Sequence, residues 1–304
     1  MATILITGGS GLIGSALTTA LLAKAHEVRH LTRAHKKVGP VRSHLWDVST
    51  GKVDPAALQG VDHIVHLAGA PIVERRWTEA RVKELIASRA DSARLLLRVA
   101  KAMDSAPKSF VSAAGIGYYG AVTSDRFFGE DEPPAKDTIA RISAAWEEGV
   151  DAWRPVTRVV KLRTPIVLAR EGGALKPLAL LTRWGLASAL GSGKQWVPWV
   201  HIDDLVRVYE RAIGDEHMVG AYNVAADDQP DQRTFMRTLA QVMGKPFFLP
   251  AVPNFVMRLI LGERAGLLVE GSRVSNDRLK AIGPHFVHPQ FEQALRSLWD
   301  GDPT

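Results

Sequence analysis

A group of closely spaced glycines near the N-terminus constrains the fold of this chain more than any other feature. The segment TILITGGSGLIG places Gly8, Gly11 and Gly14 three residues apart, after an apolar run and before a helical pattern. A strand that turns sharply into a helix brings backbone N–H groups to one point, where a pyrophosphate can bind. The alternative is a glycine turn with purely structural duties. The position between strand and helix favours a dinucleotide site.

The first half of the chain alternates strand-like and helix-like segments. Short apolar runs bounded by glycine, proline or polar clusters predict strands at residues 3–7, 27–32, 63–68, 108–113 and 156–164. Apolar residues at helical spacing predict helices at residues 13–25 and 90–103. Repeated β-α-β units predict an α/β fold, a Rossmann-like doubly wound parallel sheet with helices on both faces.

The pattern changes after about Pro165, where glycine and proline become frequent and the predicted helices shorter. We expect residues 1–168, with about 200–226 returning to the sheet, to form the Rossmann-like domain. Residues 169–199 and 227–304 are then a smaller C-terminal substrate cap. Since no flexible linker separates the two regions, we expect them to pack as one body.

The end of the second predicted strand distinguishes NADP from NAD. An NAD site places a carboxylate there for the ribose 2′-OH, whereas a 2′-phosphate requires a cation. The strand ends in Thr32 and Arg33 with no acidic residue, and Lys36 and Lys37 follow. The alternative is that Arg33 is only a solvated loop cation. The sequence predicts NADP(H).

Further residues of the predicted site follow the next strands. Leu67, Ala68 and Gly69 end the third strand with small side chains, which lets the backbone run along a cofactor, and Asp47 is placed near the adenine. His63 and His66 are three apart on a strand, so they point to opposite faces and form no metal pair. The ten histidines show no ligand spacing, and no metal is predicted.

Composition excludes several classes of protein. The chain has 304 residues, no cysteine and a net charge of +6, which excludes disulfides and thiolate sites. The basic residues are scattered and lack an aromatic platform, so no nucleic-acid partner is predicted. No apolar run reaches the roughly 18 residues of a membrane span and no signal peptide is evident, so we expect no membrane partner and a cytoplasmic protein. A monomer or a homodimer is expected.

Motifs along the whole chain resemble those of one family. They are RRWT (75–78), the pair Ser88-Arg89, GYYG (117–120), AAWEEG around Trp146, GGAL (172–175), GSGKQWVPWVHIDD (191–204) and the closing AIGPHFVHPQFEQAL. In this order they resemble a divergent extended short-chain dehydrogenase/reductase of the epimerase-like subfamily, labelled nucleoside-diphosphate-sugar epimerase or SulA-like.

The resemblance implies a Rossmann-like domain with bound NADP(H) and a C-terminal substrate cap. The residues that it implies at the cofactor are Gly8, Ser10, Gly11, Leu12, Ile13, Thr32, Arg33, Leu67, Ala68, Gly69, Glu84, Arg89 and Val167. Arg89 is a cation able to reach a phosphate or a ribose. Its alternative is a helix-surface ion pair with a residue such as Glu84.

The usual catalytic pair of the superfamily is missing. A Tyr-x-x-x-Lys pair sets tyrosine and lysine on one helix face, where the ammonium lowers the pKa of the phenol. The residues four positions after the four tyrosines are Val122, Thr123, Ile213 and Ala226. Ile139 and Ser143 occupy the helix positions where the pair is expected, and Ala114 the usual hydroxyl position. The candidates that remain are Tyr118, Tyr119 and Ser112, with His201 on the cap side; a structural histidine is the alternative for His201.

The sequence therefore predicts an NADP(H)-binding atypical short-chain dehydrogenase/reductase, either an oxidoreductase or a nucleotide-sugar epimerase with an altered proton donor. The alternative is a non-catalytic NADP(H)-binding regulatory or redox-sensing protein. An anionic or nucleotide-sugar small molecule is the expected substrate, with Arg183, Lys194 and Arg273 as candidate contacts. Cap aromatics are expected either to line a substrate cleft or to pack in the core; they are Trp184, Trp196, Trp199, Phe247, Phe248 and Phe255.

Overall fold

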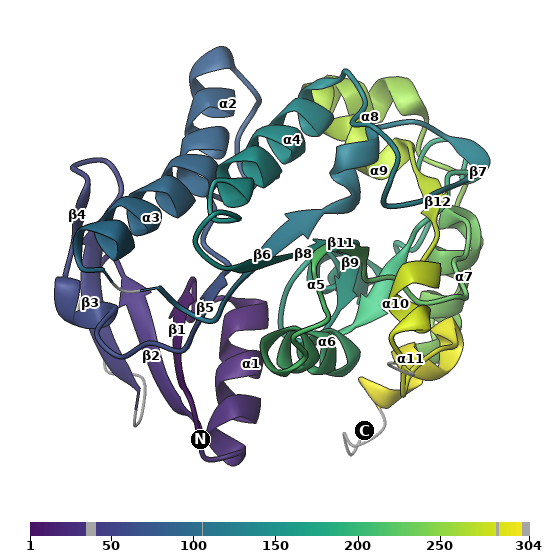
Figure 1. Cartoon of the computed structure of the whole chain (residues 1–304). Coiled ribbons are helices and arrows are strands. Elements are labelled where there is room, and N and C mark those ends of the chain that lie inside the picture. The colour runs from purple at the N-terminus through teal and green to yellow at the C-terminus, as the bar shows by residue number, and fades with distance from the viewer. Residues whose placement is uncertain (35–40, 105, 284–285, 300–304) are drawn as a thin grey trace.

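A computed structural model describes residues 1–34, 41–104, 106–283 and 286–299, and an eight-stranded sheet forms its centre (Figure 1). The strand order is β11-β8-β6-β5-β1-β2-β3-β4. The strands are β1 (Thr3–Thr7), β2 (Glu27–Thr32), β3 (Arg42–Asp47), β4 (Lys52–Val53), β5 (His63–His66), β6 (Ser109–Gly115), β8 (Arg158–Thr164) and β11 (Gly220–Asn223). Every pairing is parallel except that of β3 with β4. The predicted Rossmann-like α/β class is confirmed.

The direction of winding changes between β1 and β5. The chain proceeds from β1 through β2 to β3 on one side, then returns to place β5, β6, β8 and β11 on the other. Open parallel sheets bind ligands outside the carboxyl ends of the strands at such a point. The glycine turn after β1 and the segment after β5 therefore border the same crevice.

Helices cover both faces of the sheet (Figure 1). α1 (Leu12–Ala23) and α6 (Ile202–Gly214) cover one face, and α3 (Ser92–Ala102) and α4 (Thr138–Asp151) cover the other. β1 is buried on both sides because Ile4 and Ile6 pack in the core beneath α1 and α6, while Leu5 packs in the opposite core. This explains why the strand reads as a continuous apolar run.

The helical region before α3 is interrupted. α2 (Glu79–Ile86) runs into a π-helical turn at Ala87–Asp91, and α3 starts only at Ser92, two residues after the predicted start. π-helical turns occur often at functional sites. This one carries Arg89.

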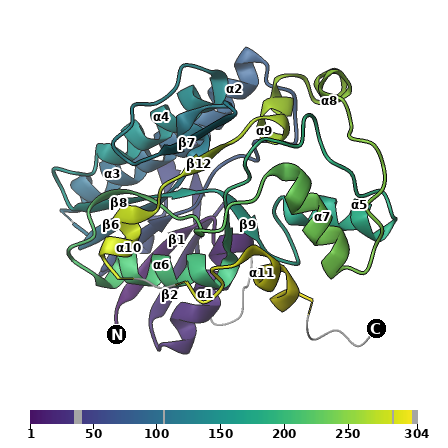
Figure 2. The same cartoon turned by 90° about the vertical axis from the view of Figure 1, so that its right-hand side faces the viewer.

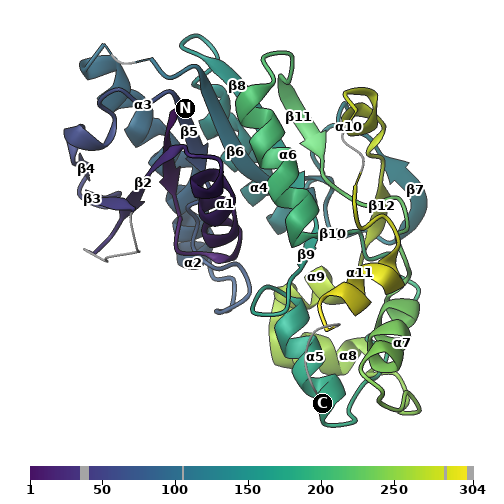
Figure 3. The same cartoon turned by 90° about the horizontal axis from the view of Figure 1, so that it is seen from below.

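The cap lies beyond the β11 edge of the sheet, on the right of Figure 2 and at the lower right of Figure 3. β9 (Ile166–Leu168) pairs with β10 (Trp199–His201), and β7 (Ser124–Phe128) pairs with β12 (Ser272–Val274). Its helices are α5 (Leu175–Arg183), α7 (Gln232–Val242), α8 (Asn254–Leu261), α9 (Gly266–Val269) and α11 (Phe291–Ser297). α10 (Asp277–Ala281) instead packs beside β11, at the left of Figure 2. Three 3₁₀ turns are Pro55–Ala57, Ile116–Tyr119 and Gly262–Ala265. No helix in the described ranges has the length and apolarity needed to cross a bilayer.

Candidate functional site

The turn after β1 has no room for side chains. Gly8 has φ of +70°, and a Cβ there would lie 2.9 Å from the carbonyl carbon and oxygen of Leu67. A Cβ on Gly14 would lie 2.4 Å from the carbonyl oxygen of Gly8. The N–H of Gly11 donates to the same oxygen at 3.0 Å and closes the turn. The glycines are therefore required for the close approach of β1, α1 and the segment after β5.

The start of α1 faces the crevice with its backbone. Gly11 is the N-cap residue, and no side chain caps the first turn of the helix. Ser10 is exposed, whereas the side chain of Ile13 packs against the core. Since the N-terminal N–H groups and the helix dipole attract negative charge, these residues can bind a phosphate through the backbone.

Thr7 holds the segment after β5 in place, a role that the sequence analysis did not find. Its Oγ1 accepts hydrogen bonds from the backbone N–H groups of Leu67 and Ala68, each at 3.1 Å. The hydroxyl therefore donates to Nδ1 of His66 at 2.9 Å, which leaves Nε2 of His66 to donate to the Arg89 carbonyl at 3.2 Å. Burial lowers the pKa of His66 to about 4. A neutral histidine thus connects β5 to the π-helical turn.

Arg89 lies beneath the segment that follows β5. A Cβ on Gly69 would lie 2.8 Å from its guanidinium carbon, and Nη2 donates to the Ala70 carbonyl at 2.8 Å. Its Nε is buried and has no hydrogen-bond partner among the described residues. Burial, with a smaller effect of Arg81, lowers the pKa of Arg89 to about 10.

The alternative interpretation of Arg89 as an ion-pair partner of Glu84 is wrong. Glu84 pairs with Nη1 of Arg81 at 2.8 Å, and its side chain is half exposed. Arg89 is buried instead and lies over the ring of Trp146, with 5.0 Å between Cζ and the ring centroid. Its orientation is set by helix packing rather than by a surface carboxylate.

The end of β2 lies at the same sheet edge. Oγ1 of Thr32 donates to the Ala34 carbonyl at 2.8 Å, and the side chain of Arg33 is exposed. Lys36 and Lys37 lie outside the described residues. The carboxylate of Asp47, at the end of β3, accepts from the backbone N–H of Ser49 at 2.8 Å. Among the residues that the structure describes, Arg33 is therefore the cation at the end of β2.

Val167 reaches this edge from β9. A Cβ on Gly173 would lie 3.3 Å from Cδ2 of Leu12 and 3.4 Å from the carbonyl oxygen of Val167. The GGAL segment thus packs on the first residue of α1. The fold brings Val167 next to the glycine turn, although the two are far apart in the sequence.

Tyr119 belongs to a buried polar network. Its hydroxyl donates to Oδ1 of Asn223 at 2.8 Å and accepts from Nη1 of Arg163 at 2.8 Å. Burial raises the pKa of Tyr119 to about 12, although Arg163 acts in the opposite direction. The geometry does not favour proton transfer by this phenol.

Tyr118 and Ser112 also point away from a common reaction centre. The guanidinium of Arg163 lies 3.7 Å from the ring centroid of Tyr118, which lines a cavity of about 460 Å³ together with Glu147 and Lys161. Ser112 is fully buried in β6, and its hydroxyl donates to the Ala113 carbonyl at 2.7 Å. The three predicted proton donors therefore do not converge.

The positions of the missing pair are filled by packing. A Cβ on Gly117 would lie 2.6 Å from Cγ1 of Ile139 and 3.2 Å from Oγ of Ser143. Both side chains are buried. The GYYG turn thus rests on α4 through van der Waals contact where other members of the superfamily place a phenol and an ammonium.

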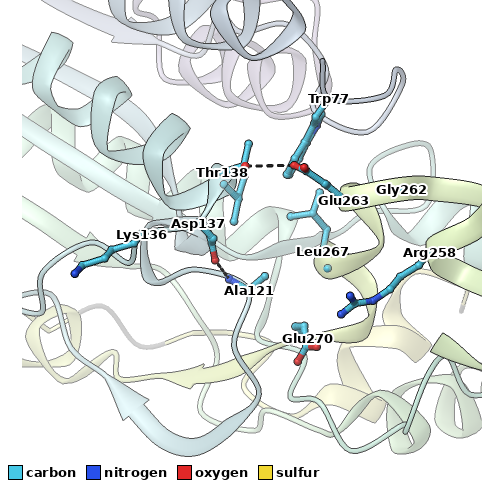
Figure 4. Close-up of a pocket in the computed structure, with 12 residues that line it drawn as sticks. Trp77, Ala121, Lys136, Asp137, Thr138, Arg258, Gly262, Glu263, Leu267 and Glu270 are labelled. Atoms are coloured by element: carbon cyan, nitrogen blue, oxygen red, sulfur yellow. Dashed lines mark hydrogen bonds between the residues drawn. The ribbon is translucent and has the colours of Figure 1, made fainter. Parts of the chain in front are cut away.

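A second cavity, of about 480 Å³, lies between α4 and the cap (Figure 4). Its lining residues are Trp77, Ala121, Lys136, Asp137, Thr138, Ile139, Arg258, Gly262, Glu263, Gly266, Leu267 and Glu270. Oγ1 of Thr138 donates to Glu263 at 3.3 Å across the cavity, and Asp137 accepts from the N–H of Ala121 at 2.6 Å. Ile139 is the link between this cavity and the position of the missing tyrosine. We refer to this second cavity as the interdomain cavity.

The cap residues predicted as substrate contacts lie elsewhere. Arg273 stacks on Trp196 with 3.4 Å between Cζ and the ring centroid, and Arg183 is exposed on α5. Neither they nor Lys194 nor the six predicted cap aromatics line the interdomain cavity. Trp77, Lys136 and Arg258 line it instead. Sequence reasoning missed them because their proximity depends on how the cap folds back.

His201 has a structural role at the start of α6. Its Nδ1 accepts from the backbone N–H of Asp203 at 3.2 Å and caps the helix, which agrees with the structural alternative for His201. Asp204 instead accepts from the N–H groups of Val287 and His288.

His201, Asp203 and His288 bring possible metal-ligand atoms within 4.8 Å of one another. The two imidazole rings are tilted by 38° with centroids 3.9 Å apart, however, and Nδ1 of His201 already accepts a hydrogen bond. We do not propose a metal site there.

A parallel sheet with a glycine turn at its switch point, completed by a C-terminal cap, defines an extended short-chain dehydrogenase/reductase. Residues 4–146 match the NAD dependent epimerase/dehydratase family, and residues 252–298 match DUF1731, a domain of unknown function. Epimerase family protein SDR39U1 of Homo sapiens is 34% identical, covering 97% of this chain and 99% of that protein. Epimerase family protein MT2273 of Mycobacterium tuberculosis is 33% identical, covering 97% and 96%. The chain belongs to the epimerase family.

Solved structures give the same assignment. Human epimerase family protein SDR39U1 with NADPH superposes with a TM-score of 0.88 at 32% identity, covering 99% of this chain and 100% of that one. The nucleoside-diphosphate sugar epimerase from Corynebacterium glutamicum gives a TM-score of 0.79 at 26% identity, covering 98% and 58%.

Proposed function

We propose that this chain binds NADP(H) and acts as an atypical oxidoreductase or epimerase on a small molecule. The observation that carries the proposal is the end of β2, where Arg33 replaces the carboxylate of an NAD site at the same sheet edge as the uncapped glycine turn. A guanidinium matches the shape and charge of a 2′-phosphate. The relative crystallised with NADPH supports this choice of dinucleotide.

The residues at the sheet edge fit such a cofactor. The glycine turn leaves the N–H groups of α1 accessible to a pyrophosphate, and Leu67, Ala68 and Val167 border the same crevice. The Nε of Arg89 is buried beside Gly69 and has no hydrogen-bond partner among the described residues, which fits a contact with the cofactor. Glu84 is exposed and pairs with Arg81. We include it among the proposed cofactor contacts because the family resemblance implies it. NADP(H), when bound, supplies hydride transfer.

The interdomain cavity is the proposed substrate site. It combines the ring of Trp77 with the cations Lys136 and Arg258 and with three carboxylates, from Asp137, Glu263 and Glu270. The two cations can bind a phosphate and the carboxylates can accept hydrogen bonds from sugar hydroxyls, two functions that a nucleotide-sugar site requires. The C. glutamicum relative, a nucleoside-diphosphate sugar epimerase, supports this class.

A non-catalytic NADP(H) sensor is the second candidate. Ile139 and Ser143 fill the positions of the catalytic pair, and the phenol of Tyr119 is held in the buried network. These contacts favour a protein that binds the cofactor without the usual proton relay. Turnover with another proton donor, such as an ordered water, would support the first candidate, an enzyme.

Calorimetric titration with NADPH and NADH tests cofactor choice. We expect NADPH to bind at least about tenfold more tightly, because a charge-assisted hydrogen bond contributes about 1.5–3 kcal/mol. Arg33→Ala should remove this preference without weakening NADH, and Arg98→Ala, which removes an exposed cation on α3, should change neither affinity. Equal affinities in the unmodified protein would refute the proposal.

A substrate panel separates the two candidates. Carbonyl compounds and nucleotide sugars are mixed with the NADPH-loaded protein while NADPH absorbance is followed. Turnover that is lost in Arg258→Ala but kept in Arg98→Ala supports an enzyme acting in the interdomain cavity. Tight NADPH binding without turnover supports the sensor.

The cytoplasmic location and the monomer or homodimer stay predictions. A relative from Arabidopsis thaliana is named as chloroplastic.

A further inference from the structure

The outer end of the cap exposes a cluster of large apolar side chains. Of the fifteen large apolar residues that are exposed in the described chain, eight belong to two cap segments. They form what we call the outer cap face: Leu180, Leu181, Trp184, Leu186, Phe248, Phe255, Leu259 and Ile260. α5, which carries Leu180 and Leu181, and α8, which carries Phe255, Leu259 and Ile260, lie at the right of Figure 2 and at the bottom of Figure 3.

α5 is apolar on both sides. Leu175 and Thr182 are buried on the side that packs against the cap core. Leu180, Leu181 and Trp184 fall on the opposite side, where Trp184 is 75% exposed. A surface helix normally turns polar residues to water. The exposed side of α5 is therefore unpartnered.

α8 and the segment before it also expose large apolar side chains. Phe255 and Leu259 are one helical turn apart and are 72% and 75% exposed, while Met257 alone is buried on this helix. Phe248, between α7 and α8, is 73% exposed. Single exposed apolar residues are common, but this end of the cap carries eight of the fifteen exposed in the described chain, which favours an interaction site.

The two segments that carry this face contain cations and no acidic residue. Residues 172–202 and 232–262 contain no Asp or Glu, yet they contain seven cations: Lys176, Arg183, Lys194, Arg233, Arg237, Lys245 and Arg258. On α5, Lys176 and Arg183 are exposed and flank the apolar side. Among the described residues neither of these two forms an ion pair, and Lys245 and Arg258 also form none. Lys176 and Arg183 are thus available to an anionic partner.

We propose that the outer cap face docks on the surface of an anionic phospholipid bilayer. Exposed tryptophan, phenylalanine and leucine suit the boundary between headgroups and acyl chains, and flanking Lys and Arg attract anionic lipids. A second copy of the chain would bring these cations against each other, which opposes a symmetric dimer through this face. Docking requires no spanning helix and does not depend on the proposed NADP(H) chemistry.

Vesicle flotation tests the proposal with the full chain. We expect binding to vesicles of phosphatidylcholine with phosphatidylglycerol, no binding to phosphatidylcholine alone, and loss of binding at high salt. Lys176→Gln with Arg183→Gln should weaken binding roughly thirtyfold, since each cation near the surface contributes about 1 kcal/mol. The matched control Arg98→Gln with Lys101→Gln, on α3, should bind like the unmodified protein. Neither pair lines the interdomain cavity.

Tryptophan fluorescence locates the contact. Trp184 is the only one of the eight tryptophans that is exposed, so its emission should shift to the blue on anionic vesicles, and Trp184→Phe should remove the shift. Equal binding to neutral and anionic vesicles, or unchanged binding of the α5 charge variant, would overturn the proposal. Self-association that Trp184→Ser abolishes, in a protein that does not bind vesicles, would also overturn the proposal. That last result would assign the face to a second copy.

Discussion

Tyr119 and Arg163 are joined by a 2.8 Å hydrogen bond inside the protein, with Nη1 of the arginine donating to the phenol oxygen. The same arginine binds Glu147 through two nitrogens, at 2.7 and 3.1 Å. The active-site turn of the superfamily is therefore tied here to β8 and α4 by a buried polar network. Two predictions concern this network.

Tyr119→Phe should destabilise the protein by about 1–3 kcal/mol. The change leaves a buried N–H of Arg163 and the Oδ1 of Asn223 without the phenol as partner. Affinity for NADPH should stay the same, because the hydroxyl is engaged within the protein. Denaturant unfolding measures the loss, and Tyr118→Phe, whose hydroxyl makes no hydrogen bond with a described residue, should lose little. A large loss of NADPH affinity without destabilisation would place Tyr119 at the cofactor instead.

Glu147→Gln should cost about 3–5 kcal/mol of folding free energy. Glu147 neutralises Arg163 at 2.7 Å and shares Lys161 with Asp151, each at 3.0 Å, and the side chains of Glu147, Lys161 and Arg163 are buried. Removing one partner from a buried pair leaves charge uncompensated. Thermal unfolding and the soluble yield measure this. The neighbour Glu148 is exposed, so Glu148→Gln is the matched control and should behave like the unmodified protein; equal stabilities of the two variants would contradict the prediction.

Gly8→Ala should weaken NADPH binding at least about tenfold and destabilise the fold, because its Cβ would press on the backbone of Leu67. Gly51→Ala separates this contact from the cost of a positive φ. Gly51 has φ of +68° with nothing within 4 Å of its Cβ, so it should lose only the roughly 1–2 kcal/mol of left-handed backbone strain. Its NADPH affinity should be unchanged. Identical behaviour of the two variants would show that the close approach has no consequence.

Acid should destabilise the protein through His66. Its pKa is about 4 in the folded protein and about 6.5 in the unfolded chain, so the unfolded state takes up the proton first as pH falls. The contribution to stability is complete above about pH 6.5 and is lost as pH falls towards 4, to a total of roughly 3 kcal/mol. His66→Gln should flatten the stability curve in this range. His217→Gln, at an exposed position, should leave its slope unchanged; a slope equally steep without His66 would disprove the assignment.

The sheet and its dinucleotide-binding edge could be predicted because their signals are local. The apolar runs of β1 and β5 and the glycines of the first turn are each readable within a few residues. The close approach of Gly8 to Leu67 was not predicted, because it joins the ends of two strands that are far apart in the sequence. Bounds differed by a few residues where strands fade into turns, as at the end of β5.

The rest depends on long-range contacts. The partner of Tyr119 is Asn223, 104 residues away, so no local pattern distinguishes a buried phenol from a catalytic one. The sequence left two interpretations of Arg89, because the π-helical turn that rotates it inward has no signal in composition or periodicity. Trp77 and Arg258 meet at one cavity only after the cap has folded over α4.

The edge strand β11 has a consequence for synthesis. It pairs with β8, and α6, just before it, covers the sheet beside α1. A nascent chain that has only reached Pro165 exposes the open edge of β8 together with the apolar surface that α6 will cover. The ribosome must extrude the first part of the cap before the sheet can close, so the first half of the polypeptide is exposed to aggregation and to chaperones until Asn223 has left the exit tunnel.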